Sequence, residues 1–120
     1  MDIEISHVKD KGDQEEERIF LKVNSDCNLN RYILFDSTFE DDEVSNKHRH
    51  SFFWKPYDVK QGDLVVVYSK EGKQGASPSL KDKTKTTHFF YWGMDEQTIW
   101  NKGGDRALLV HVDDFHSKNV

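Results

Sequence analysis

The sequence has few of the residues that cross-link a chain, interrupt it or anchor it in a membrane. It contains one cysteine, Cys27, and two prolines in 120 residues. A lone thiol forms no internal disulfide, so packing alone must hold the fold, and we interpret Cys27 as a small side chain beside a turn. No stretch approaches the ~18 apolar residues of a transmembrane helix. The first residues, Met1-Asp2-Ile3-Glu4, lack the basic and apolar regions of a signal peptide, which favours a cytoplasmic protein.

Excess positive charge is also missing. Lys and Arg total 17 against 22 Asp and Glu, which gives a net charge of −5. Binding to nucleic acids and to anionic membranes depends on Lys and Arg, so this balance disfavours both partners. Apolar residues make up 35% of the chain and charged residues 32%, but aromatic residues reach 12%. Disordered chains are poor in aromatics, so the composition indicates a folded domain with charged loops.

Helical spacing of apolar residues is absent as well. Apolar residues recur with period two or in short runs, which is the pattern of strands. Expected strands are Ile3–Val8, Arg18–Asn24, Arg31–Asp36, His50–Trp54, Asp63–Ser69, Thr86–Trp92, Thr98–Trp100 and Arg106–Val112. Seven or eight short strands at this spacing predict one all-β domain over residues 1–120, an antiparallel sandwich or barrel. Two long connections are expected, a solvated acidic loop at Thr38–Lys47 and a mobile segment at Lys70–Lys85.

Two long segments carry a resemblance to a known family. They are "HSFFWKPYDVKQGDLVVVYS" and "HFFYWGMDEQTIWNKGGDRALLV", and the similar region runs from about Arg18 to Asp113. The chain resembles the lamin-tail domain, an immunoglobulin-like module of lamins and bacterial proteins. It departs from the family in the long loop before His48 and in the charged stretch Lys81–Lys85. The residues that match the family signature are Tyr91, Trp92, Gly93, Trp100, Asn101, Gly103, Gly104 and Asp105. The resemblance implies an immunoglobulin-like β-sandwich that serves as a binding or tethering module.

The signature also has a local structural interpretation. Ile99 and Trp100 are expected to end one strand, and Gly103-Gly104 supply the positive φ angles of a tight hairpin that leads into the last strand. Gly93 is expected to permit a bulge or a sharp bend after the aromatic strand. These residues are therefore structural.

Several clusters were considered as metal sites. His48 and His50 share one face of an expected strand, and His88 lies on another strand, so three imidazoles are candidate zinc or copper ligands. No cysteine is near them, and we favour ordinary surface or strand-end histidines. The acidic run Glu40–Glu43 offers oxygen ligands for calcium but lacks the spacing of a calcium loop. We expect no metal and no cofactor.

Other functional motifs are weak or missing. Lys81, Lys83 and Lys85 alternate, so an extended segment would present them together to a phosphate, but three charges are few for a net-negative domain. Spacing does not bring Asp63, Asp105 and His111 together, and no nucleophile motif accompanies them. We therefore expect no enzymatic activity.

The aromatic strand carries the functional hypothesis. His88, Phe90 and Trp92 share one face, whereas Phe89 and Tyr91 share the other, so we expect Phe90, Trp92, Trp100 and Leu108 in the core. Both faces of several strands are apolar, and an apolar outer face marks a contact site. The sequence thus predicts protein binding or self-association through an outer face or edge. The alternative is binding of carbohydrate or cell wall through exposed rings. The candidate contact residues are Trp54, Tyr57, Phe89 and Tyr91.

Overall fold

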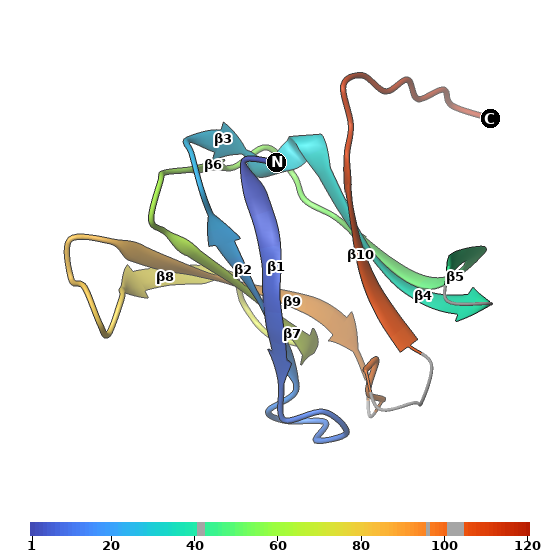
Figure 1. Cartoon of the computed structure of the whole chain (residues 1–120), viewed down its shortest axis with the longest axis horizontal. Coiled ribbons are helices and arrows are strands. Elements are labelled where there is room, and N and C mark those ends of the chain that lie inside the picture. Colours follow the sequence, from blue (N-terminus) through green and yellow to red (C-terminus); the bar gives the residue numbers. More distant parts are fainter. Residues whose placement is uncertain (41–42, 96, 101–104) are drawn as a thin grey trace.

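The chain folds as an all-β structure (Figure 1). A computed structural model describes residues 1–40, 43–95, 97–100 and 105–120, and it describes only the backbone of residues 38–40, 43–49 and 105. Within these ranges the only helix is one 3-10 turn, η1 (Leu29–Arg31). No described helix has the length and apolar character to cross a membrane. The described strands are β1 (Ile3–Lys9), β2 (Arg18–Val23), β3 (Cys27–Asn28), β4 (Tyr32–Glu40), β5 (Glu43–Phe53), β6 (Asp58–Val59), β7 (Leu64–Lys70), β8 (Gly75–Pro78), β9 (Thr86–Met94) and β10 (Asp105–His111).

The larger sheet has five strands in the order β1-β2-β7-β9-β8. β1, β2, β7 and β9 alternate between core-facing and outward-facing side chains, as the period-two pattern predicts. The expectation of a wholly antiparallel fold is wrong at one pair, because β7 and β9 run parallel. The chain leaves β7, forms β8 at the sheet edge and returns as β9 between them. Two parallel strands cannot be joined by a tight hairpin and need a longer connection. Here the connection between β7 and β9 includes β8, which runs antiparallel to β9.

The smaller sheet has the order β10-β4-β5, and a two-residue ladder joins β3 to β6. β4 and β5 extend well beyond the expected strands, so residues 38–40 and 43–47 form a strand pair where we expected a solvated acidic loop. β8 likewise lies within the segment expected to be mobile. Thr98–Trp100 forms no strand, and β10 pairs with β4 instead. The expected glycine hairpin falls on residues 101–104, outside the described residues.

The core lies between the two sheets and the turns that join them. It contains Ile19 and Leu21 from β2, Val65 and Val67 from β7, Leu34 from β4 and Phe90 from β9. Trp100 is buried and Trp92 packs against the core, as the alternation predicted. Leu108 was expected there too, but Ala107 and Leu109 are the β10 residues that pack inward. The phase of the strand was therefore misjudged by one residue.

Gly93 introduces the irregularity that the sequence predicted. Its φ is +87°, a value that side chains disfavour. Between the pairs Tyr68–Tyr91 and Lys70–Met94 the register slips by one residue, so β9 carries an extra residue there. This bulge ends the regular pairing of β7 with β9.

Candidate interaction surface

The outer face of the smaller sheet carries apolar residues from all three strands. Residues paired directly across strands point to the same face. One row consists of Phe53, Ile33 and Val110. The next row places Phe35 between Leu108 and the exposed Ser51. None of the five apolar residues belongs to the core cluster or packs against it. We call this set, Ile33, Phe35, Phe53, Leu108 and Val110, the β10–β4–β5 outer face.

Phe53 is the most exposed member of this face. Its side chain is 45% exposed, and its ring meets the ring of Phe115 edge-on with centroids 5.3 Å apart. Phe115 lies in the C-terminal segment and is 51% exposed. The large apolar residues classed as exposed in the described ranges are Met1, Phe53, Leu80, Phe115 and Val120. Within this set, the described ring contacts join only Phe53 and Phe115.

The C-terminal segment is held to the smaller sheet just before Phe115. The Val112 amide donates to the Arg31 carbonyl at 2.7 Å, which extends the β10–β4 ladder by one bond. The Arg31 guanidinium then donates to the Asp113 carbonyl at 2.8 Å. In Figure 1 the segment turns away from the end of β10 and runs towards the C-terminus.

The outer face of the larger sheet carries a ladder of stacked side chains. His7 stacks on Phe20 with centroids 4.6 Å apart and an angle of 7°. The Arg18 guanidinium lies 5.5 Å from the centre of Phe20 and 5.6 Å from that of Tyr68. Tyr68 stacks on Tyr91 at 5.3 Å and 13°. Stacking and cation–π contacts thus link side chains across β1, β2, β7 and β9.

The far end of this ladder is also covered. A Cβ atom built on Gly72 would overlap the Tyr91 ring, so the backbone at Gly72 lies directly against that ring. Val66 is 1% exposed although it lies outside the main core cluster. Its cross-strand neighbours are Phe20 and Phe89, and we infer that they cover it. The expected outward placement of Phe89 and Tyr91 is therefore correct, but both side chains are half-buried within a second small cluster.

Two of the expected contact residues face inward. Trp54 is 2% exposed and packs edge-on against Phe52 and Phe90, so the expectation of an exposed ring is wrong. Tyr57 is half-buried, packs against Phe90 and forms a hydrogen bond with His88. Trp54 follows β5 directly, and its inward direction continues the inner face of Phe52. These residues do not present the open ring faces on which sugars stack.

Tyr57, His88 and Asp63 form a chain of hydrogen bonds. Tyr57 Oη lies 2.7 Å from His88 Nδ1, and His88 Nε2 lies 2.9 Å from Asp63 Oδ2. Because an ionised carboxylate only accepts, Nε2 carries the proton, and in the neutral ring Nδ1 accepts from the tyrosine hydroxyl. Asp63 also accepts from the amides of Lys60 and Thr86.

The ionisation of two members of this chain is shifted. Burial pushes the pKa of Asp63 upward, but the hydrogen bonds from His88, Lys60 and Thr86 and the His88 charge together hold it below its ordinary value. Burial and, next, the Asp63 charge raise the pKa of Tyr57. At neutral pH Tyr57 therefore keeps its hydroxyl proton, which it can donate to His88.

The candidate metal ligands are dispersed. His50 Nδ1 lies 3.0 Å from the buried carboxylate of Asp36, and His88 is occupied by Tyr57 and Asp63. β9 pairs with β7 and β8, so His88 does not neighbour the strand of His48 and His50. Across the described residues no three His, Cys, Asp or Glu side chains are grouped to hold a metal. The His48 side chain, and those of the acidic run Glu40–Glu43, lie outside the described residues.

The lysine stripe does not form. Residues 81–85 contain bends and a turn instead of an extended segment. Lys81 and Lys83 are exposed, but the Lys85 ammonium donates to the Gln61 carbonyl at 3.1 Å and its stem lies against Gly62. The three charges therefore do not act as one row.

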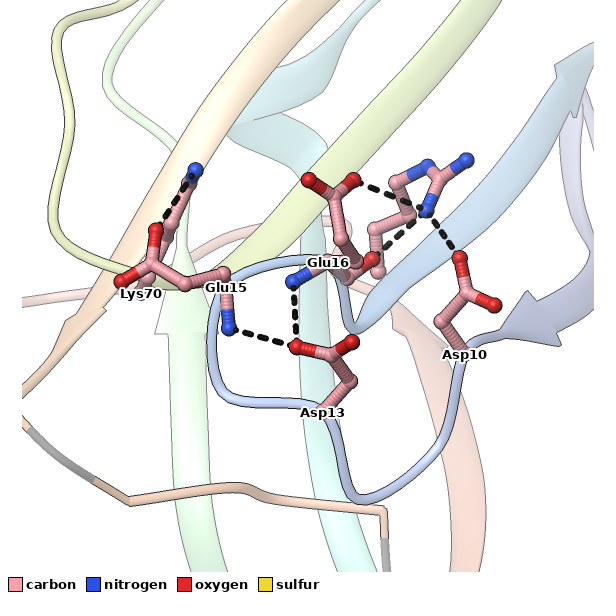
Figure 2. A network of polar contacts seen from close by, with 6 residues as sticks. Asp10, Asp13, Glu15, Glu16 and Lys70 are labelled. Carbon is pink, nitrogen blue, oxygen red and sulfur yellow. Dashed lines mark hydrogen bonds and ion pairs between the residues drawn. The ribbon is translucent and has the colours of Figure 1, made fainter.

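Charged side chains form a network at the β1–β2 loop (Figure 2). Arg18 donates to Asp10 at 2.9 Å and to the Glu16 carbonyl at 2.6 Å, while Asp13 accepts from the Glu15 and Glu16 amides. Beside this loop is a polar hollow of about 280 Å³ lined by Gln14, Glu15, Lys70, Glu71, Met94 and Asp95. Within its lining, the Lys70 ammonium contacts Glu15, and the Gln14 side-chain amide donates to the Met94 carbonyl. These polar groups of the lining therefore already have partners within the chain.

Glu17 is a buried carboxylate that ties distant segments together. It is fully buried and accepts from the Gly12 amide at 2.9 Å and the Ser69 hydroxyl at 2.5 Å. It also accepts from the consecutive amides of Ile99 and Trp100 at 2.7 and 3.2 Å. One side chain therefore joins the β1–β2 loop, the end of β7 and the segment before β10.

Glu17 and the hydrogen-bonded chain of Tyr57, His88 and Asp63 have only weak signals in the sequence. Glu17 ends a run of three glutamates, a pattern typical of a solvated stretch. The first two are indeed exposed, and only Glu17 is buried. Tyr57 and Asp63 lie in turns just before strands. Their positions in the sequence do not show how close they come to His88 in the fold. His88 was expected at the surface or at a strand end, but it is 8% exposed, so that expectation is wrong. The available signal was the strand face that His88 shares with Phe90, because a buried imidazole requires hydrogen-bond partners.

Comparison of the sequence with protein-family models and with curated proteins gave no match.

Proposed function

We propose that the chain is a non-catalytic protein-binding module, an immunoglobulin-like sandwich of lamin-tail type, that contacts its partner through the β10–β4–β5 outer face. The observation that carries the proposal is the contact between two half-exposed rings, Phe53 on the sheet face and Phe115 in the C-terminal segment. Two packed sheets and the bulge at Gly93 support the domain type.

The apolar rows give this face its binding capacity. A sandwich needs only one buried face per strand, and here β4 and β10 place Leu34 and Leu109 inward while Ile33 and Val110 point outward. Contiguous apolar surface on an outer face commonly marks a protein contact. A large aromatic anchor such as Phe53 is the residue type that dominates binding energy at such surfaces.

The other outer face is less suited to this role. On the larger sheet Tyr68 and Tyr91 stack on each other, and Arg18 lies over Tyr68 while bonded to Asp10. A partner would have to displace these internal contacts before it formed its own. The same stacking occupies ring surface that carbohydrate binding would need, so no described contact favours the carbohydrate alternative.

A substitution on the face tests the proposal. Phe53→Ser removes the aromatic anchor, and Leu80→Ser is the matched control, because Leu80 is an apolar side chain that is 98% exposed in a loop away from this face. For self-association we expect sedimentation velocity to show concentration-dependent dimerisation of the wild-type and Leu80→Ser chains, with loss in Phe53→Ser. A chain that stays monomeric throughout overturns the self-association form.

The same pair of variants tests a different protein as partner. A protein captured by the wild-type chain should bind Leu80→Ser equally and Phe53→Ser at least about tenfold more weakly. Equal capture by wild type and Phe53→Ser contradicts the proposed face. Thermal unfolding of each variant, monitored by circular dichroism, shows whether Phe53→Ser retains the fold.

A further inference from the structure

The structure assigns the C-terminal segment Val112–Val120 as an internal ligand of the β10–β4–β5 outer face, one that competes with an extended, aromatic-bearing peptide of the partner. This inference rests on the proposed function, because it concerns what the same face binds and how access to it is limited. The segment is present in the chain and already contacts the face, so its contacts define the chemistry that the face accepts.

The first contact is a continuation of the sheet. The Val112 amide donates to the Arg31 carbonyl, so the segment leaves β10 as an added residue of the ladder with β4. The Arg31 guanidinium then donates to the Asp113 carbonyl, which fixes the backbone by a charge-assisted bond that is independent of the side chain at 113. These contacts fix the start of the segment beside the first residues of β4.

The second contact supplies the side-chain preference. β10 and β5 lie on opposite sides of β4, so a segment that leaves β10 and meets Phe53 on β5 must cross β4. The crossing covers two strand spacings, roughly 10 Å. Three residues from Val112 to Phe115 span about 10 Å when extended. Phe115 is thus the residue placed to reach Phe53.

The internal contact is incomplete. About half of each ring stays exposed in the pair, and residues 113–120 are exposed throughout. An intramolecular segment benefits from a high effective concentration, so even a weak contact covers the face for part of the time. A partner peptide that offers a better-buried aromatic residue displaces Phe115 from Phe53. The face is then partly covered until a competing peptide arrives.

The probe for this inference is a synthetic peptide with the sequence Val112–Val120, labelled with a fluorophore. The receptor is the full chain, either wild type or with Phe115→Ala, which keeps the segment but removes its ring. Because Phe115 is half-exposed, this substitution does not threaten the fold. The matched control receptor is His116→Ala, which changes the next, exposed residue.

We expect the Phe115→Ala chain to bind the peptide saturably in fluorescence anisotropy, at least about threefold more tightly than the wild-type chain, because the internal competitor is disabled. The His116→Ala chain should behave as wild type. A peptide in which the phenylalanine is replaced by alanine should bind neither receptor.

Two results overturn the inference. One is a peptide that fails to bind the Phe115→Ala chain, and the other is equal affinity for the wild-type and Phe115→Ala chains. Either result leaves the proposed function standing if association still depends on Phe53. Conversely, peptide binding that survives Phe53→Ser with Phe115→Ala shows that the peptide uses a different surface and contradicts the inference and the proposed face together.

Discussion

Glu17 Oε2 accepts a hydrogen bond from the Ile99 amide at 2.7 Å, across 82 residues of sequence. The same carboxylate accepts from Trp100, Gly12 and the Ser69 hydroxyl, and it is fully buried. A buried carboxylate is costly unless donors surround it, and here four donors do so. The segment before β10 is thus held by an acceptor placed before β2, without strand pairing at residues 97–100.

Removal of this acceptor should destabilise the fold strongly. Glu17→Ala leaves the Ile99 and Trp100 amides buried without their acceptor, and we expect the free energy of unfolding to fall by more than about 3 kcal/mol. Glu17→Gln should lose less, because one oxygen still accepts while the new amide group faces donors. Urea unfolding followed by tryptophan fluorescence measures both effects.

Glu71→Gln is the control for these variants, because Glu71 is an exposed carboxylate on the loop after β7. We expect its urea midpoint to match that of the wild-type chain. If Glu17→Ala also unfolds at the wild-type midpoint, then the four hydrogen bonds to Glu17 contribute nothing to stability.

The lowered pKa of Asp63 predicts a dependence of stability on pH. A carboxyl group whose pKa is lower in the folded chain binds protons more weakly there than when unfolded. Its contribution is fully present above the unfolded pKa, near 3.8, and is lost as the pH falls through the lower folded pKa. We therefore expect Asp63→Asn to flatten the decline in stability with acid in that window.

Urea midpoints measured from neutral pH down to about pH 3 test this expectation. The pKa of the exposed Asp82 is also lowered, mainly by hydrogen bonds from Thr84, so Asp82→Asn is the comparison variant. An acid decline of unchanged steepness in Asp63→Asn would show that other carboxyl groups cause it. Asp63→Asn should also lower stability at neutral pH, because it weakens the acceptor for His88 and for the Lys60 and Thr86 amides.

Features of this fold that depend on local sequence were predictable, whereas those that depend on contacts between distant residues were not. Alternation in β2, β7 and β9 reflects burial of one face, a local rule, and it placed Phe90, Phe89 and Tyr91 on the correct sides. The parallel pairing of β7 with β9 depends on where the chain returns after β8, and no local pattern records that. Leu108 was assigned to the wrong face. Because β10 is apolar on both faces, its sequence pattern does not show which face is buried.

The sequence predicted an apolar outer surface but not which sheet carries it. Apolar residues on both faces of a strand indicated an outer apolar patch, but two such faces exist, and only the contacts distinguish them. Tyr91 is engaged by Tyr68 and Gly72, whereas Phe53 meets only the half-exposed Phe115 among the described ring contacts. Ring stacking across strands and the course of the C-terminal segment are long-range features without a signal in the spacing of residues.

The close approach of Gly72 to Tyr91 predicts an unusual sensitivity to one methyl group. Gly72→Ala would force the Tyr91 ring or the loop to move, and we expect a loss of about 1–3 kcal/mol of stability. Gly75→Ala is the matched control, since a Cβ there meets nothing within 4 Å. Thermal and urea unfolding compare the two variants.

A double variant identifies the cause. If the clash with the ring destabilises Gly72→Ala, then adding Tyr91→Ala removes the clash, and the two losses should be strongly non-additive. Additive losses would mean that Gly72 matters for a reason other than the ring. Near-ultraviolet circular dichroism reports separately whether the tyrosine stacking of the ladder has changed.

The environment of Cys27 predicts a slow thiol. Burial raises its pKa to about 11, and the charges of Asp2 and Asp26 act in the same direction. Because only the thiolate reacts, the folded chain at pH 8 should react with iodoacetamide about 100-fold more slowly than the urea-unfolded chain. Asp26→Asn should increase the folded rate modestly, since one repelling charge is gone. Mass spectrometry of timed samples measures these rates, and a folded rate within a few-fold of the unfolded rate contradicts the raised pKa.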